Sequence, residues 1–263
     1  MIDIALSPAA AEAAAEHLAR LDAAAPGLVA GLHVIGSAAL DDYRPGVSDL
    51  DVVAELIREP DADDLAALGA AHTGPGVHVE AVYLRAGELT GPPERASAGP
   101  WANDGELNVT DRAFLLNPVT WLQLDRHRVT VRGERPHPPV DAAAVHAFCR
   151  ENLAAYWAPL LEQAAALLGL RGPGDPVLPT AVMWIAFGPA RLWHTLRTGE
   201  VVSKSRGAEL AAREWPDLAD PLRQLVAARA GEPVPLTAEH GRAALEVGRR
   251  ILAEADVAVS PAG

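Results

Sequence analysis

Two acidic residues, Asp49 and Asp51, lie two positions apart at the start of an apolar segment. On a strand, residues at this spacing point to the same face, where their charges repel each other. Carboxylate oxygens arranged in this way are ligands that Mg²⁺ accepts when substrate phosphates supply the remaining ones. The spacing therefore predicts a site for Mg²⁺ and a phosphorylated substrate. The alternative is a solvated strand start in which Ser48 and Asp49 form a turn, and these residues alone leave it open.

Two further features could belong to the same site. Gly36 and Ser37 end the preceding apolar segment, where glycine lets a phosphate approach closely and a hydroxyl and backbone amides could bind its oxygens. A third acid, Glu80, lies in the middle of a strand-like segment at 77–84. Because the alternation of that segment assigns Glu80 to one face of a strand, we do not expect it to be an incidental loop residue.

The elements that must position these residues fall into two parts. The first part alternates helical and strand-like patterns, whereas the pattern after the prolines at 136, 138 and 139 is helical throughout. We therefore expect an α+β protein, with an α/β domain built on a mixed sheet at 1–138 and an all-α helical bundle at 139–263. The segment 87–111, rich in Gly, Pro, Ser and Asn, is expected to be a long loop that borders the site. Expected helices are 8–21, 61–71, 141–169, 180–198, 203–214, 218–230 and 237–256, and expected strands are 32–35, 49–56 and 77–84.

Composition limits the possible partners. The 263 residues carry a formal net charge of −13, which disfavours a protein that must neutralise the phosphates of DNA or RNA. No apolar run approaches the roughly 20 residues of a membrane span, so we expect no membrane partner and a cytoplasmic location. The single cysteine, Cys149, is expected to be a small buried filler. The sequence is compatible with a monomer but does not determine the oligomeric state.

The order of these motifs is more specific than any one of them. Gly-Ser at a strand end, a loop, Ser-Asp-Leu-Asp and a later strand with Glu80 together resemble the signature of the nucleotidyltransferase superfamily that includes DNA polymerase β. In the second part, "ARLWHTLRTGEVVSKSRGAELAAREWP" at 190–216 is similar to the C-terminal domain of aminoglycoside 3''- and 9-adenylyltransferases. These are the streptomycin and spectinomycin resistance enzymes. Polymerases and tRNA-modifying members of the superfamily need a basic track, which this chain lacks.

The family resemblance implies a role for ten residues. Taken without it, Lys204 would be an exposed turn residue, Arg191 a stem packed along its helix, and Trp101 a loop residue returning to the core. The implied roles are magnesium ligands for Asp49 and Asp51, general base for Glu80, nucleotide binding for Gly36, Ser37, Ser48, Arg191 and Lys204, and substrate binding for Trp101 and Asp104.

The activity implied by the resemblance is transfer of AMP from ATP, with Mg²⁺, to a hydroxyl of a small cationic amino-sugar or aminocyclitol antibiotic, releasing pyrophosphate. Two alternatives stay open: transfer to another small-molecule or protein acceptor, and a non-catalytic nucleotide-binding regulatory protein. The chain departs from the family pattern at Asp41 and Asp42, where the family usually has glycine. The segment 172–188 also does not reproduce the family's acidic drug-binding segment, which leaves the acceptor undecided.

Overall fold

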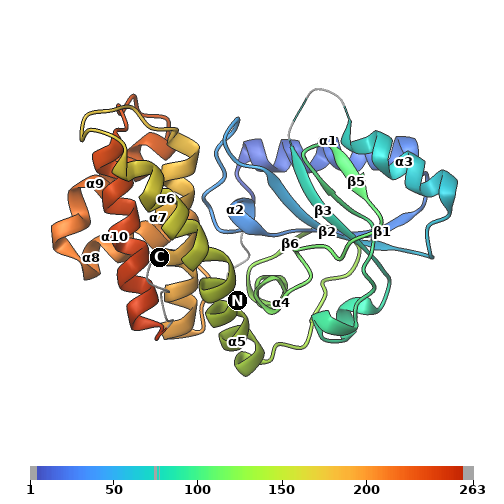
Figure 1. Cartoon of the computed structure of the whole chain (residues 1–263). Coiled ribbons are helices and arrows are strands. Elements are labelled where there is room, and N and C mark those ends of the chain that lie inside the picture. The colour runs from blue at the N-terminus through green and yellow to red at the C-terminus, as the bar shows by residue number, and fades with distance from the viewer. Residues whose placement is uncertain (1–4, 74–75, 77, 257–263) are drawn as a thin grey trace. The chain divides into compact units, whose positions relative to one another are not determined.

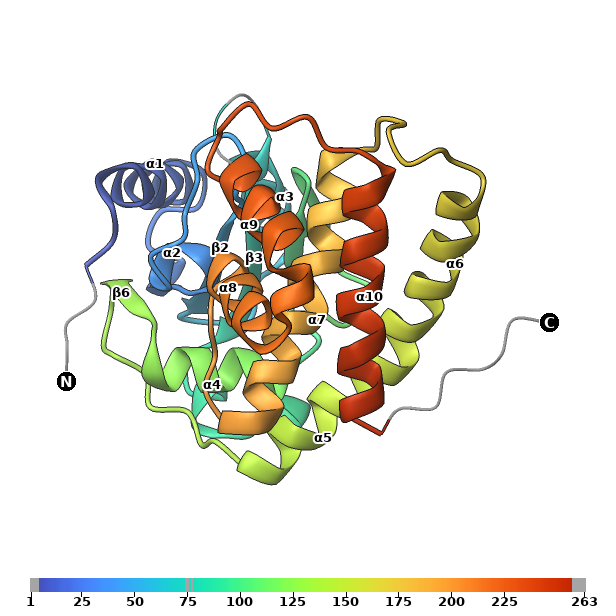
Figure 2. The same cartoon turned by 90° about the vertical axis from the view of Figure 1, so that its left-hand side faces the viewer.

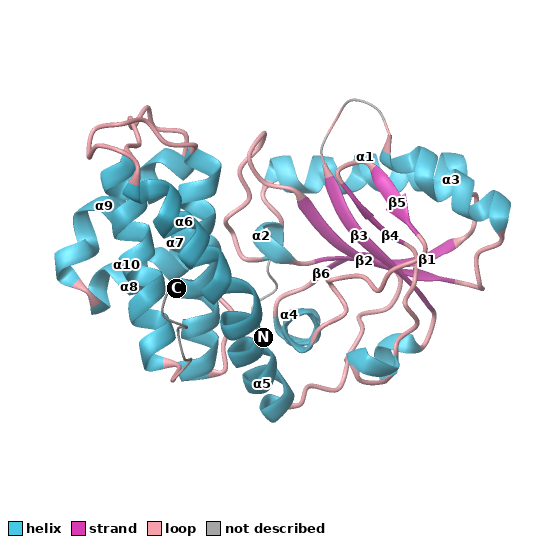
Figure 3. Ribbon diagram, in the orientation of Figure 1, coloured by secondary structure: helices cyan, strands magenta, loops and turns pink. Residues whose placement is uncertain are grey.

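The computed structural model describes residues 5–73, 76 and 78–256, and the chain forms two compact units, 1–141 and 142–263 (Figure 1). The division falls directly after the proline-rich segment. The first unit is built on a mixed β-sheet and the second is helical, which confirms the expected fold class (Figure 3). Each unit has its own buried apolar core and is described below by itself.

The sheet of the first unit brings three strand ends to one edge. Strands β2 and β3 are parallel, and β1 is antiparallel to β2. The carboxyl end of β1 therefore meets the amino ends of β2 and β3. The strands described in this unit run in the order β5-β4-β3-β2-β1-β6 and are β1 (Val29–Val34), β2 (Leu50–Leu56), β3 (Val79–Arg85), β4 (Trp101–Asn103), β5 (Glu106–Asn108) and β6 (Val129–Arg132).

Helices cover both faces of this sheet. In Figure 3, α1 (Pro8–Ala24) and α3 (Ala62–His72) lie on one face and α4 (Pro118–Arg126) lies on the other. Because side chains alternate along a strand, each face buries its own set of residues. The α1 and α3 face buries Leu32, Val52, Ala54, Ala81 and Tyr83, whereas the α4 face buries Ile35, Val53, Val82, Leu84 and Trp121.

Several elements of this unit were not predicted from the sequence. They are the short helix α2 (Gly36–Ala39), α4, β6 and the hairpin of β4 and β5. The expectation of a long loop at 87–111 was wrong, because that segment forms the 3₁₀ turns η1 (Glu88–Thr90) and η2 (Pro93–Arg95) and then the hairpin. Asp104 and Gly105 turn the hairpin with φ of 49° and 79°, the positive values that such tight turns require.

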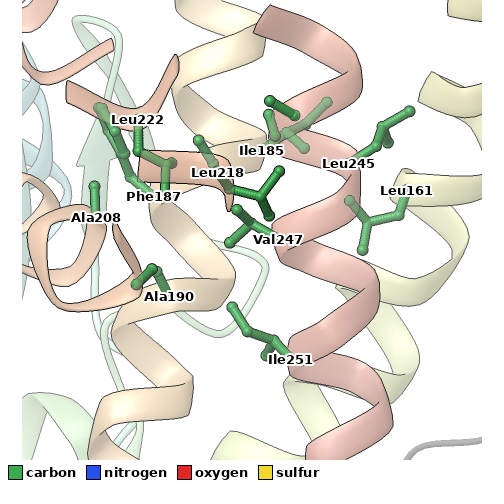
Figure 4. Close-up of a cluster of buried hydrophobic side chains, with 14 of the residues drawn as sticks. Leu161, Ile185, Phe187, Ala190, Ala208, Leu218, Leu222, Leu245, Val247 and Ile251 are labelled. Atoms are coloured by element: carbon green, nitrogen blue, oxygen red, sulfur yellow. The ribbon is translucent and has the colours of Figure 1, made fainter. Parts of the chain in front are cut away.

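The second unit packs its helices around one large core. Helices α7 (Pro179–Thr198) and α10 (Ala238–Glu254) run side by side (Figures 1 and 2). Figure 4 shows side chains of this core, among them Phe187, Leu222 and Val247. The helix expected at 141–169 is interrupted by a π-helical turn. The remaining elements are α5 (Ala142–Asn152), the π-turn η3 (Leu153–Trp157), α6 (Ala158–Gly169), α8 (Lys204–Glu214), η4 (Pro216–Leu218) and α9 (Ala219–Arg229).

Cys149 is buried in α5, as expected of a small filler residue. Burial raises the pKa of its thiol to about 12, so the reactive thiolate is suppressed at neutral pH. None of the helices formed by the described residues combines the length and apolarity needed to span a bilayer.

A pair of histidines, one buried and one partly exposed, links the stability of the first unit to pH. His17 of α1 is 3% exposed, and its ring centroid lies 4.8 Å from that of His72 on α3. Burial, together with the charges of His72 and Arg20, lowers the pKa of His17 to about 3, and burial lowers the pKa of His72 to about 4. As pH falls below about 6.5, the unfolded chain takes up protons on these residues, whereas the folded chain does not until lower pH.

We therefore expect the free energy of unfolding to fall as pH drops from 7 toward 4. Each histidine contributes at most about 1.4 kcal/mol per pH unit. Denaturant unfolding at a series of pH values measures the slope, which His17→Leu should make shallower. His146→Leu, which replaces an exposed histidine on α5, is the matched control and should leave the slope unchanged. Equal slopes for all three proteins would contradict this assignment.

Candidate active site

The acidic residues expected in the site, Asp49, Asp51 and Glu80, meet at the end of the sheet where β1 ends and β2 and β3 begin. We call this end of the sheet the acidic edge. Asp51 lies directly across from Glu80 in the parallel register, and both are partly exposed. Asp49 precedes β2 by one residue and is also partly exposed. Like charges directly opposite each other on neighbouring strands destabilise a sheet. The arrangement therefore concentrates negative charge that a bound cation would relieve.

Gly36 packs directly against one of these acids. Its φ is +62°, and a Cβ atom built at this position would overlap the carboxylate of Asp51. The backbone N–H of Ile35 donates to the carbonyl oxygen of Asp51 at 3.0 Å, which fixes the two segments together. Glycine is therefore required here both by the backbone conformation and by the close approach of the chain to Asp51.

A residue that the sequence analysis missed holds this turn. The Gly36 N–H donates to Oε1 of Gln123 at 3.0 Å, and Gln123 is 6% exposed on α4. The Gly36 N–H is therefore bonded within the protein, and the role of Gly36 at the nucleotide stays a prediction. Asn117 and Pro118 carry the cap and first-turn signals from which α4 could have been predicted.

The loop between α2 and β2 is closed by its own hydrogen bonds. Ser48 Oγ accepts from the Arg44 N–H at 3.1 Å, and the Ser37 carbonyl accepts from the Asp42 N–H at 2.9 Å. Asp42 is 2% exposed and forms an ion pair with Arg44 at 3.6 Å. Ser37 and Ser48 thus lie beside the acidic edge, while their role at the nucleotide stays a prediction.

Tyr43 is a second residue near the site that the sequence analysis did not single out. It is buried in the same loop, and its pKa is raised by burial and, to a lesser extent, by the negative charge of Asp49. Its phenol is therefore neutral at physiological pH and can serve as a hydrogen-bond donor beside Asp49.

Replacing Gly36 tests how closely the backbone at Gly36 packs against the Asp51 carboxylate. We expect Gly36→Ala to lower the free energy of unfolding by a few kcal/mol and to displace Asp51, because it adds both backbone strain and overlap. Gly46→Ala is the matched control: Gly46 has φ +75°, but a Cβ atom there meets nothing within 4 Å. Denaturant unfolding of both variants separates strain from overlap. Equal losses of stability would contradict a close fit against Asp51.

The structure gives Trp101 and Asp104 structural roles. The indole N–H of Trp101 donates to the Asp111 carbonyl at 3.0 Å, and its ring packs edge-on against Phe114 at 5.7 Å between centroids. Asp104 is exposed in the hairpin turn. The assignment of both residues to substrate binding remains a prediction.

Another residue of the hairpin lies nearer to the acidic edge. Strand β4 pairs Trp101 with Val82 and Ala102 with Ala81. Extending this register by one residue places Asn103 across from Glu80. Asn103 was not predicted from the sequence, because its segment was expected to be a loop.

The predicted cationic residues lie in the second unit, where α7 is followed by α8. Arg191 of α7 donates from Nε to the Val202 carbonyl at 3.2 Å. Lys204 is the first residue of α8, which Ser203 caps by accepting the Arg206 N–H at 3.2 Å. The predicted residues therefore fall into two groups. Those of the first unit are Gly36, Ser37, Ser48, Asp49, Asp51 and Glu80, and those of the second are Arg191 and Lys204.

The acidic edge has the donor chemistry that Mg²⁺ prefers. Its carboxylates are hard oxygen ligands, and the register places Asp51 beside Glu80. Within 5–73, 76 and 78–256, no group of three or more His, Cys, Asp or Glu side chains is arranged to hold a metal ion by itself. A site with two protein ligands, completed by substrate phosphates and water, is the arrangement in which Mg²⁺ is usually bound with nucleotides.

Comparison with solved structures identifies the fold. The chain is similar to spectinomycin adenyltransferase AAD(9) from Enterococcus faecialis, whose crystal structure contains ATP and spectinomycin. The TM-score is 0.60, with 12% sequence identity, over 91% of this chain and 98% of that chain. The chain has the fold of an adenylyltransferase. The resemblance drawn from the sequence is thus confirmed at the level of the fold, and no family model or curated protein matches the sequence.

Proposed function

We propose that the protein transfers AMP from ATP, in the presence of Mg²⁺, to a hydroxyl of a small amino-sugar or aminocyclitol antibiotic. The main support for this proposal is that Asp51 lies opposite Glu80, next to Asp49 and Gly36, at one end of the sheet. The chain that forms this sheet has the fold of an adenylyltransferase. The similar structure contains ATP and spectinomycin, which supports this substrate pair.

Asp49 and Asp51 would hold Mg²⁺, which when bound neutralises charge on the phosphates. Glu80 accepts the proton of the attacking hydroxyl. The hydroxyl oxygen forms a bond to the α-phosphorus, the bond from that phosphorus to the bridging oxygen breaks, and pyrophosphate leaves with the electron pair. Each group thus has one role: the two aspartates bind, and the glutamate moves the proton.

The remaining predicted residues contribute binding. Lys204 and Arg191 form charge-assisted contacts with phosphate oxygens. Trp101 and Asp104 contact the acceptor from the edge of the sheet. The net charge of −13 favours a cationic acceptor over an anionic one, an effect that weakens as salt screens the charges.

A pyrophosphate-release screen with ATP and Mg²⁺ against aminoglycosides and aminocyclitols tests the proposal. We expect release with at least one of these acceptors, a product that carries one AMP, and loss of release when Mg²⁺ is chelated. ATP binding without release for every acceptor would instead indicate a non-catalytic nucleotide-binding protein. Release only with a neutral or anionic acceptor would contradict the antibiotic part and leave nucleotidyl transfer intact.

A further inference from the structure

A row of polar residues crosses four strands at the acidic edge. Asp51 of β2 lies opposite Glu80 of β3 in the parallel register. Extending the register of β3 and β4 by one residue places Asn103 across from Glu80, and β5 pairs Glu106 with Asn103. Neighbouring strands lie about 4.8 Å apart, so Asn103 is one strand spacing beyond Glu80 and Glu106 is two.

These four side chains belong to one face of the sheet. A chain neighbour of each one packs into the core on the α1 and α3 face, namely Val52, Ala81, Ala102 and Leu107. Because side chains alternate along a strand, the four polar side chains point to the opposite face. The row therefore continues the surface formed by Asp51 and Glu80 as far as the last strand of the sheet.

The side chains of Asn103 and Glu106 are available to a ligand. Asn103 is partly exposed, and its amide forms no hydrogen bond within residues 5–73, 76 and 78–256. Glu106 is exposed and has no cationic partner in the same part of the chain. The two-residue turn of Asp104 and Gly105 joins them, so backbone pairing determines their relative position.

The proposed reaction gives the two sides of Glu80 different occupants. Mg²⁺ and the phosphates lie beside Asp51, and Glu80 takes the proton of the attacking hydroxyl. Because that oxygen approaches the α-phosphorus in line with the leaving pyrophosphate, the rest of the acceptor extends away from Asp51, past Glu80 and toward Asn103. An amide both donates and accepts hydrogen bonds, which suits a hydroxyl or amine, whereas a carboxylate suits a cation.

We propose that Asn103 binds the acceptor by a hydrogen bond to the polar group next to the attacked hydroxyl, and that Glu106 attracts a cationic group farther along the same molecule. The proposal rests on the proposed function and narrows its acceptor class. The attacked hydroxyl has a hydroxyl or amine as its neighbour, and the acceptor carries a positive charge within roughly 10 Å of it, the distance of two strand spacings.

Titration calorimetry with ATP, spectinomycin and streptomycin tests this proposal on the full chain. We expect Asn103→Ala to raise the Kd of at least one antibiotic by roughly 2- to 12-fold, which corresponds to one lost hydrogen bond, and to leave the Kd of ATP unchanged. Glu106→Gln should raise the Kd of the same antibiotic by roughly 1.5- to 5-fold at low salt. That difference should disappear as salt rises, because salt screens an exposed charge pair.

Two matched controls replace the same residue types elsewhere. Asn152→Ala in α5 and Glu94→Gln in η2 should leave all three Kd values unchanged. Denaturant unfolding of Asn103→Ala should give a free energy of unfolding close to that of the unaltered protein. Weaker binding of ATP and antibiotic together, with lower stability, would show that Asn103 only holds the hairpin and would overturn the proposal.

The remaining outcomes separate this proposal from the proposed function. Unchanged antibiotic Kd values in both Asn103→Ala and Glu106→Gln would overturn the acceptor contacts alone. If the unaltered protein binds ATP but neither antibiotic, the antibiotic part of the proposed function fails, and these contacts fail with it. Absence of ATP binding would overturn nucleotidyl transfer itself.

Discussion

Asp51→Asn is expected to abolish AMP transfer while leaving the fold as stable as before or more stable. Removing a ligand of Mg²⁺ removes several kcal/mol of charge stabilisation, which corresponds to roughly a thousandfold or greater loss of turnover. The same change removes a negative charge that lies directly across from Glu80, so the sheet loses a repulsion and no core packing. Asp49→Asn should behave similarly.

Pyrophosphate release and denaturant unfolding of the same preparations check this pair of effects. Asp63→Asn is the control, because it removes an equivalent charge from an exposed position on α3. It should leave turnover unchanged. Near-normal turnover by Asp49→Asn or Asp51→Asn would show that the replaced aspartate does not bind the metal. Loss of turnover together with unfolding would show that the replaced aspartate has a structural role.

The elements that could be predicted are those with strong local signals. Ser7 and Pro8 begin α1, and Asp61 begins α3 through a capping box with Asp64, as their residue types indicate. The hairpin at Trp101–Asn108 was missed because each strand has three residues, too few for alternation to stand out. The π-turn at 153–157 was missed because one extra residue in a turn barely disturbs an apolar pattern.

The site could be predicted from the sequence only in part, because its geometry depends on which strands are neighbours in the sheet. Asp49 and Asp51 are local neighbours, but their approach to Glu80 depends on β2 and β3 being parallel and adjacent, which spacing alone does not determine. The Gly36 bond to Gln123 joins residues 87 positions apart and required the helix α4 in its place. Contacts of this kind follow from tertiary packing rather than from any local pattern.

Glu80→Gln is expected to lower turnover by roughly a hundred- to ten-thousandfold while ATP binding is retained. A positioned general base contributes about this factor, and the amide keeps the size of the side chain but cannot accept the proton. The predicted change in stability is small and favourable, because the charge opposite Asp51 is lost. The expected signature is therefore a fall in kcat with little change in the Kd of ATP.

Calorimetry for ATP and single-turnover rates of pyrophosphate release distinguish the possible roles of Glu80. Glu94→Gln, an exposed acid in η2, is the matched control and should retain both properties. If Glu80→Gln loses ATP affinity in the presence of Mg²⁺ and keeps its rate at saturating ATP, Glu80 acts with Asp51 as a metal ligand and not as the base. The strand register is compatible with either role of Glu80, because it places the Asp51 and Glu80 carboxylates side by side. Whether Glu80→Gln lowers the affinity for ATP or the rate of release therefore decides between a metal ligand and a general base.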